Sequence, residues 1–118
     1  MDGLDGTTQR LADFHKLHDT LSVVVVTPQE IYNEFSGGVA TPIAIRDFVK
    51  MFYDKAAIND IPKYVLLFGD ASYDYKNRIS GNTNLVPTSE TNESINKTTG
   101  YCTDDFFGFL DDHENQNN

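Results

Sequence analysis

The apolar positions divide the first seventy residues into alternating helical and extended segments. Apolar residues recur at intervals of three or four between Leu11 and Leu21, which predicts an amphipathic helix that Thr7 or Thr8 can cap. Residues 23–26 are four consecutive valines. β-branched side chains without polar alternation favour an extended strand buried on both faces. Such a strand is typical of a parallel sheet covered by helices.

Two helix start signals follow the valines. Thr27, Pro28 and Glu30 match a capping box with proline in the first turn, so a helix is predicted to begin here and to end at residues 37–38, both glycine. Residues 41–42, Thr-Pro, repeat the start signal for a second helix. The apolar face of that second helix contains Ile45, Phe48, Val49, Phe52 and Ala56.

A second unbroken apolar run, residues 64–68, is closed by Gly69 and Asp70. Two apolar strands joined by about 37 residues of helical crossover form a βαβ pattern, because parallel strands need a long connection. The chain is therefore predicted to be an α/β protein, with a parallel sheet and helices on both faces. The pattern by itself fits a flavodoxin-like three-layer sandwich.

The sequence becomes polar after Asp70. Residues 71–100 are rich in Asn, Ser and Thr and predict a long loop with a short strand near residues 85–86. Residues 106–110 form a last apolar run, interpreted as an edge strand or hairpin arm. We expect residues 1–112 to belong to one folded unit and residues 113–118 to be a disordered polar tail.

The formal net charge is −9, made of −3 up to Gly69 and −6 beyond it. A field of this sign repels phosphate backbones, so nucleic acid is not an expected partner. No segment approaches the roughly 20 apolar residues that cross a bilayer. The single cysteine, Cys102, excludes an intrachain disulfide.

Four carboxylates are candidates for a metal site or a site wall. Ligands of open α/β sheets bind outside the carboxyl ends of the strands, where Asp70 and Asp74 follow the second apolar run. With Asp104 and Asp105 they could supply oxygen ligands to calcium, although the spacing differs from that of an EF-hand. The alternatives are aspartates that bond to their own backbone and a solvated acidic surface.

Catalysis by Cys102 would need a histidine as its base. His15 and His18 lie on the first predicted helix, and His113 lies in the polar tail. Cysteine is also a common small buried hydrophobe, and neither a nucleophile elbow nor a phosphate-binding loop is present. We assign no catalytic and no cofactor-binding residue.

Five segments taken together resemble the gingipain-type cysteine peptidases, and above all the sortase of the Bacteroidetes type IX secretion system. The segments are residues 29–38, 44–48, 64–78, 86–88 and 103–108. The resemblance implies a caspase-like α/β sandwich and a cysteine nucleophile with a histidine that precedes glycine. It also implies processing and surface attachment of exported cargo proteins, with the protein located at the cell envelope, at the outer membrane surface or in the secreted fraction.

The catalytic residues of that family have no counterpart here. The three histidines precede Lys16, Asp19 and Glu114 instead of glycine, and Cys102 lies in a stretch that resembles the family upstream of its catalytic pair. The resemblance therefore implies a truncated sandwich, the N-terminal part of a peptidase domain, whose Cys/His pair lies downstream. Its expected partners are the remainder of that domain and exported cargo.

Two rival interpretations remain, a flavodoxin-like binder of a small molecule and a calcium-binding or protein-interaction module. The apolar runs also suggest association. If a central strand is missing, residues 21–26 and 64–68 must either pair directly with each other or expose unpaired apolar edges, and exposed edges favour a homo-oligomer joined through the sheet.

Overall fold

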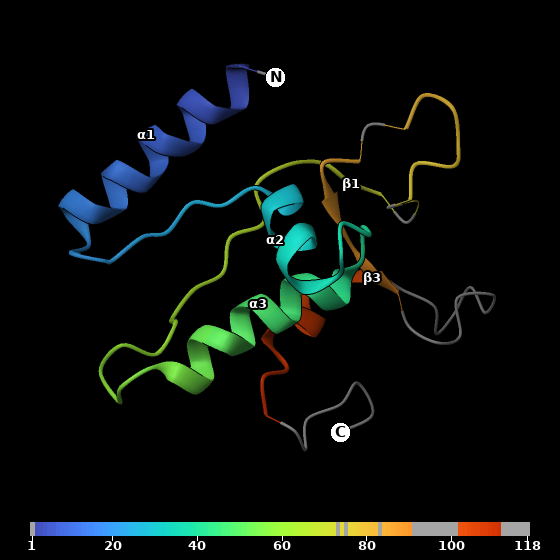
Figure 1. Ribbon diagram of the computed structural model, residues 1–118. Helices are drawn as coiled ribbons and strands as arrows, with labels where there is room; N and C mark the ends of the chain where they lie inside the picture. Colours follow the sequence, from blue (N-terminus) through green and yellow to red (C-terminus); the bar gives the residue numbers. More distant parts are fainter. Residues whose placement is uncertain (1, 73, 75, 83, 91–101, 112–118) are drawn as a thin grey trace.

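The computed structural model describes residues 2–72, 74, 76–82, 84–90 and 102–111. Within them the chain is a small α/β protein with three α-helices, four two-residue strands and one 3₁₀-helix (Figure 1). The helices are α1 (Asp2–His18), α2 (Pro28–Phe35), α3 (Pro42–Lys55) and the 3₁₀-helix η1 (Asp105–Gly108). The strands are β1 (Ala71–Ser72), β2 (Val86–Pro87), β3 (Ser89–Glu90) and β4 (Cys102–Thr103).

Helix α1 confirms the first predicted helix, but it begins at Asp2, so the predicted cap at Thr7 or Thr8 is wrong. Most of its apolar face is uncovered. Figure 1 shows α1 to one side of α2 and α3. Ala12 is buried, whereas Phe14 and Leu17 are 51% and 81% exposed. The ring of Phe14 packs on that of His18, with centroids 4.3 Å apart. The end of α1 is therefore stabilised chiefly by contacts within the helix.

Helices α2 and α3 begin where the sequence predicts. The Glu30 backbone N–H donates to Thr27 Oγ1 at 3.3 Å, and the Thr27 backbone N–H donates to Glu30 Oε2 at 2.8 Å. This is the complete capping box. Thr41 caps α3 by accepting from the Ile43 N–H. Each helix thus satisfies part of its open first turn with its own side chains.

The core lies where α2, α3 and η1 meet. Ile31 and Tyr32 from α2, Ala44 and Ile45 from α3, and Phe107 from η1 form one buried cluster. Phe107 is only 2% exposed. Burial raises the pKa of the Tyr32 hydroxyl, because the charged form is poorly solvated there. The cluster joins residues that are more than seventy positions apart in the sequence.

The two apolar runs are not the buried strands that the sequence predicts. Residues 23–26 and 64–68 have no strand assignment, and Val24 and Leu66 are 64% and 67% exposed. A buried parallel strand needs neighbouring strands on its edges and helices on its faces. The described part of the chain supplies no strand beside either run. The prediction of buried strands is wrong for this chain for that reason.

The short strands form two separate pairs. β1 is parallel to β2, with Ala71 opposite Val86, which confirms a strand near residues 85–86. β3 is antiparallel to β4, with Glu90 opposite Cys102. The predicted strand at residues 106–110 is wrong, because η1 occupies this segment. The Phe107 N–H donates to the Asp104 carbonyl, and the resulting turn directs Phe107 into the core.

Gly69 allows the second apolar run to turn onto β2. Its φ is +149°, and a Cβ at this position would lie 2.8 Å from Leu85 Cβ. The next carbonyl, that of Asp70, accepts from the N–H groups of Leu85 and Val86 at 2.9 and 3.1 Å. Both the backbone conformation and this close approach require glycine.

Removing the α2 cap tests the first of these helix signals. We expect Thr27→Ala to lower the free energy of unfolding by about 1 kcal/mol, the usual cost of losing a threonine cap. Thr27→Ser retains the hydroxyl and is the matched control. Urea unfolding measures both. Equal stability of the two variants would contradict the assigned cap.

The cost of Thr27→Ala also depends on pH. The pKa of the Glu30 carboxyl is lowered because the backbone N–H and then the hydroxyl of Thr27 donate to it. A carboxyl with a lowered folded pKa contributes stability that is present above its unfolded pKa and lost as the pH falls through the folded value. The difference between Thr27→Ala and Thr27→Ser should therefore shrink on acidification.

Adding a methyl group at Gly69 tests the turn. Gly69→Ala combines a strained φ with the short approach to Leu85, so we expect a loss of about 1–3 kcal/mol in the free energy of unfolding. Gly108→Ala is the control, since a Cβ at Gly108 meets nothing within 4 Å. A Gly69→Ala variant as stable as Gly108→Ala would refute the steric account.

Candidate functional site

A closed loop follows β1, and several of its hydrogen bonds converge on its first residue, Asp74. This Asp74 loop comprises residues 74–82, of which 74 and 76–82 are described. Asp74 is only 8% exposed. Its Oδ2 accepts from the Ile79 N–H at 2.7 Å, and its carbonyl accepts from the Asn77 N–H at 3.0 Å. A buried carboxylate requires such donors, and here the loop backbone supplies one of them.

Two asparagine side chains complete the closure. Asn82 Nδ2 donates to the Asp74 carbonyl at 2.6 Å and approaches Asp74 Oδ2 at 3.5 Å. Asn84 Oδ1 accepts from the Ser72 N–H at 2.8 Å. Asn77 has a φ of +54°, a conformation that asparagine tolerates better than most residues. The loop is thus held mainly by its own side chains.

The four candidate metal ligands occupy different settings. Asp70 is exposed and bonds to β2 through its carbonyl, whereas Asp74 is enclosed by its own loop. Asp104 and Asp105 precede and begin η1, where the Asp105 N–H donates to Thr103 Oγ1. Among the described residues, no group of three or more His, Cys, Asp or Glu is placed to hold a metal ion. A calcium site stays a prediction.

Cys102 is exposed at the start of β4, opposite Glu90 on β3. Its Sγ lies 3.9 Å from Glu90 Oε1, at the limit of a weak hydrogen bond. A nucleophilic cysteine needs a base or a positive charge that favours its thiolate. The neighbouring carboxylate supplies neither a positive charge nor the imidazole base used by cysteine peptidases.

The two described histidines lie in the last turn of α1. His15 Nδ1 is 2.5 Å from Asp19 Oδ2, and His18 packs on Phe14. Lys16 lies in the same turn, where its positive charge complements the helix dipole. These contacts are local to α1 and its end. His113 lies outside the described residues.

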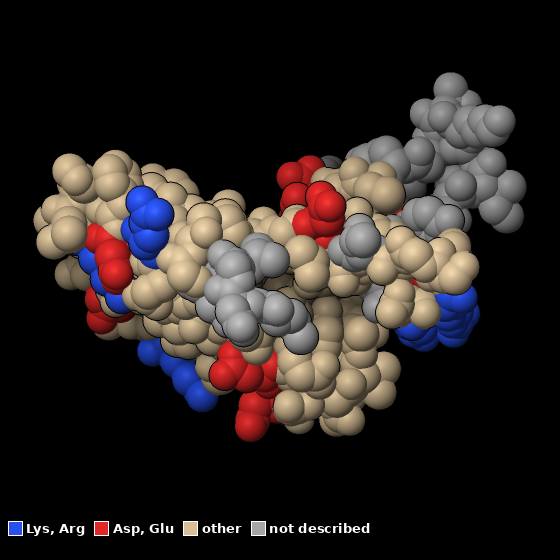
Figure 2. All heavy atoms as spheres, turned by 90° about the horizontal axis from the view of Figure 1, so that it is seen from above, with Lys and Arg blue, Asp and Glu red and all other residues tan. Residues whose placement is uncertain are grey.

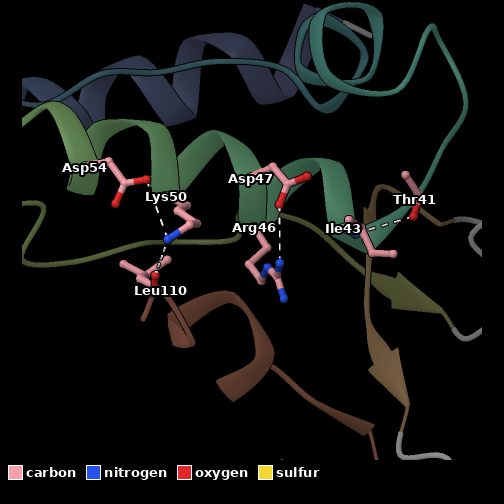
Figure 3. Close-up of polar contacts among 7 residues, drawn as sticks. All are labelled: Thr41, Ile43, Arg46, Asp47, Lys50, Asp54 and Leu110. Atoms are coloured by element: carbon pink, nitrogen blue, oxygen red, sulfur yellow. Dashed lines mark hydrogen bonds and ion pairs between the residues drawn. The ribbon is translucent and has the colours of Figure 1, made fainter. Parts of the chain in front are cut away.

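Helix α3 secures η1 and the residues after it through Lys50 and Arg46. Figure 3 shows Lys50 bonded to Leu110, and Arg46 paired with Asp47 on the same helix. Lys50 Nζ donates to the Leu110 carbonyl at 2.8 Å and pairs with Asp54 at 3.5 Å. The Arg46 guanidinium carbon lies 5.4 Å from the ring centroid of Phe106, a cation–π distance. These contacts link β4 to the core through η1.

On the face that Figure 2 shows, the charged side chains are dispersed. On the face in Figure 2, acidic side chains form small separate groups, and basic side chains lie toward the two sides of the view. None of the described helices is both long enough and apolar enough to cross a membrane. Neither sign of charge forms a continuous patch on the face shown.

Sequence reasoning missed several of these partners. Asn82, Asn84 and Glu90 contribute to the loop and to the Cys102 environment, yet none was singled out. The clue for the asparagines is their density between Asp74 and Val86, since short amide side chains commonly bond to nearby backbone. Glu90 has no comparable signal, because its position depends on pairing across twelve residues.

The comparisons with known proteins give one match. The family model for peptidase family C25 matches residues 2–118, nearly the whole chain. No curated protein and no solved structure matches. The matched range includes the Asp74 loop, Cys102 and η1. The chain therefore belongs to peptidase family C25, the gingipain family of cysteine peptidases.

Proposed function

We propose that this chain is a non-catalytic segment of a gingipain-type cysteine endopeptidase. It supplies helices and loop walls to a site whose nucleophile and base come from residues outside this chain. The observation that carries the proposal is the environment of Cys102, whose sulfur faces the Glu90 carboxylate. The described histidines make local contacts on α1, so no Cys/His pair is built from described residues.

The exposed apolar runs support the same proposal. Residues 23–26 and 64–68 are rich in β-branched and large apolar side chains, yet Val25 and Val65 remain 44% and 47% exposed. The remainder of the peptidase domain would cover these runs and pair with their backbones. Residues 1–112 would then form the N-terminal part of a caspase-like three-layer sandwich, with residues 113–118 as a polar tail.

The finer part of the proposal is a sortase-like role. The segments at residues 64–78 and 103–108 resemble the type IX secretion sortase, so exported cargo at the cell surface or outer membrane is the proposed substrate of the parent enzyme. The flavodoxin-like alternative is less well supported. It needs a phosphate-binding loop after a strand, whereas residues 23–26 lead directly into the capping box of α2. Association through the apolar runs stays a prediction.

A peptidase assay on the isolated chain tests the proposal. We expect no cleavage of arginyl, lysyl or mixed peptide substrates, with or without a thiol reductant, because no described histidine lies beside Cys102 to act as its base. Cys102→Ala should be indistinguishable from the unmodified chain, and an active cysteine peptidase serves as the assay control. Thiol-dependent turnover that disappears in Cys102→Ala would overturn the assignment of a non-catalytic segment.

A further inference from the structure

The tip of the Asp74 loop, residues 76–79, differs in charge from the chain around it. Beyond Gly69 the sequence contains three basic residues, and two of them, Lys76 and Arg78, belong to this tip. Arg78 is exposed and has no ion pair with any described residue. The adjacent Ile79 is 51% exposed. A cation and an apolar side chain are thus exposed at neighbouring positions of a chain of charge −9.

The loop anchors this tip on both sides of Arg78. The Asn77 N–H is bound to the Asp74 carbonyl at 3.0 Å, and the Ile79 N–H is bound to the Asp74 carboxylate at 2.7 Å. Asn82 bonds to Asp74 from the far side of the loop. A segment already ordered in the free protein loses less conformational entropy on binding. The loop therefore has the construction of a pre-formed recognition element.

We propose that the tip of the Asp74 loop binds an acidic stretch of peptide. Arg78 pairs with a carboxylate, because the planar guanidinium matches carboxylate geometry. Ile79 contacts an apolar side chain next to that carboxylate. The negative charge of the rest of the chain opposes a long polyanion, so a peptide with one or two carboxylates fits better than nucleic acid. The choice of a peptide rests on the proposed function, since peptidases act on peptides.

Fluorescence anisotropy of the full chain tests this proposal. The probe is a short labelled peptide with Glu-Leu in a Gly/Ser background, and the control peptide has Lys-Leu in its place. We expect the Glu-Leu peptide to bind more tightly. Arg78→Glu should weaken its binding about five- to ten-fold, the scale expected when one exposed ion pair becomes a repulsion. Arg10→Glu, the matched control on α1, makes the same charge change and should leave binding unchanged.

Two further variants separate the tip contact from loop order. Ile79→Ser should weaken binding of the Glu-Leu peptide but should leave binding of a Glu-Ser peptide unchanged. Asn82→Ala retains Arg78 but removes a hydrogen bond that orders the loop, so it should weaken binding of both the Glu-Leu and the Glu-Ser peptide. The proposal would be overturned if Arg78→Glu and Arg10→Glu changed the affinity for the Glu-Leu peptide equally. It would also be overturned if that peptide did not bind measurably, or if the Lys-Leu peptide bound equally well. An oligonucleotide that binds as tightly as the Glu-Leu peptide would do the same.

Different measurements would refute the non-catalytic role of the chain and peptide binding by the Asp74 loop. Thiol-dependent turnover by the isolated chain would refute the non-catalytic role and leave the anisotropy result intact. Absence of peptide binding would refute recognition by the Asp74 loop and leave the lack of turnover intact.

Discussion

Burial of Phe107 against α2 and α3 is the interaction on which the described fold depends. It places a C-terminal side chain among Ile31, Tyr32 and Ala44, and so closes a chain segment of about fifty residues between α3 and η1. Closing such a segment costs conformational entropy, which apolar burial must offset. Lys50 and Arg46 then hold the segment around Phe107 against α3.

This core is small, and the most apolar parts of the sequence lie largely outside it. Leu67 packs against the cluster, but Val24, Tyr64 and Leu66 are among the exposed large side chains. Exposed contiguous apolar surface commonly marks an interface. Under the proposed function, a sheet completed by the rest of the peptidase domain would remove that surface from water.

The local elements were predictable, whereas the pairing of distant ones was not. Thr27, Pro28 and Glu30 place the start of α2 because a capping box uses backbone and side chains within one turn. Residues 23–26 have the composition of a buried strand, but burial depends on neighbours that the described chain lacks. The run at residues 106–110 was misjudged because its aromatic side chains suit a strand as well as a 3₁₀ turn. In the candidate site, the enclosure of Asp74 depends on hydrogen bonds from Asn82. The spacing of these residues alone could not predict that the loop is held in this way.

Amide hydrogen exchange on the dilute isolated chain tests the central claim most directly, that the apolar runs are uncovered while α3 and η1 form the core. Exchange reports local opening residue by residue. The account predicts rapid exchange across residues 23–26 and 64–68, and much slower exchange in the middle of α3, from Arg46 to Met51. Protection of both apolar runs comparable with that of α3 would contradict it, because the runs would then be paired and covered within this chain.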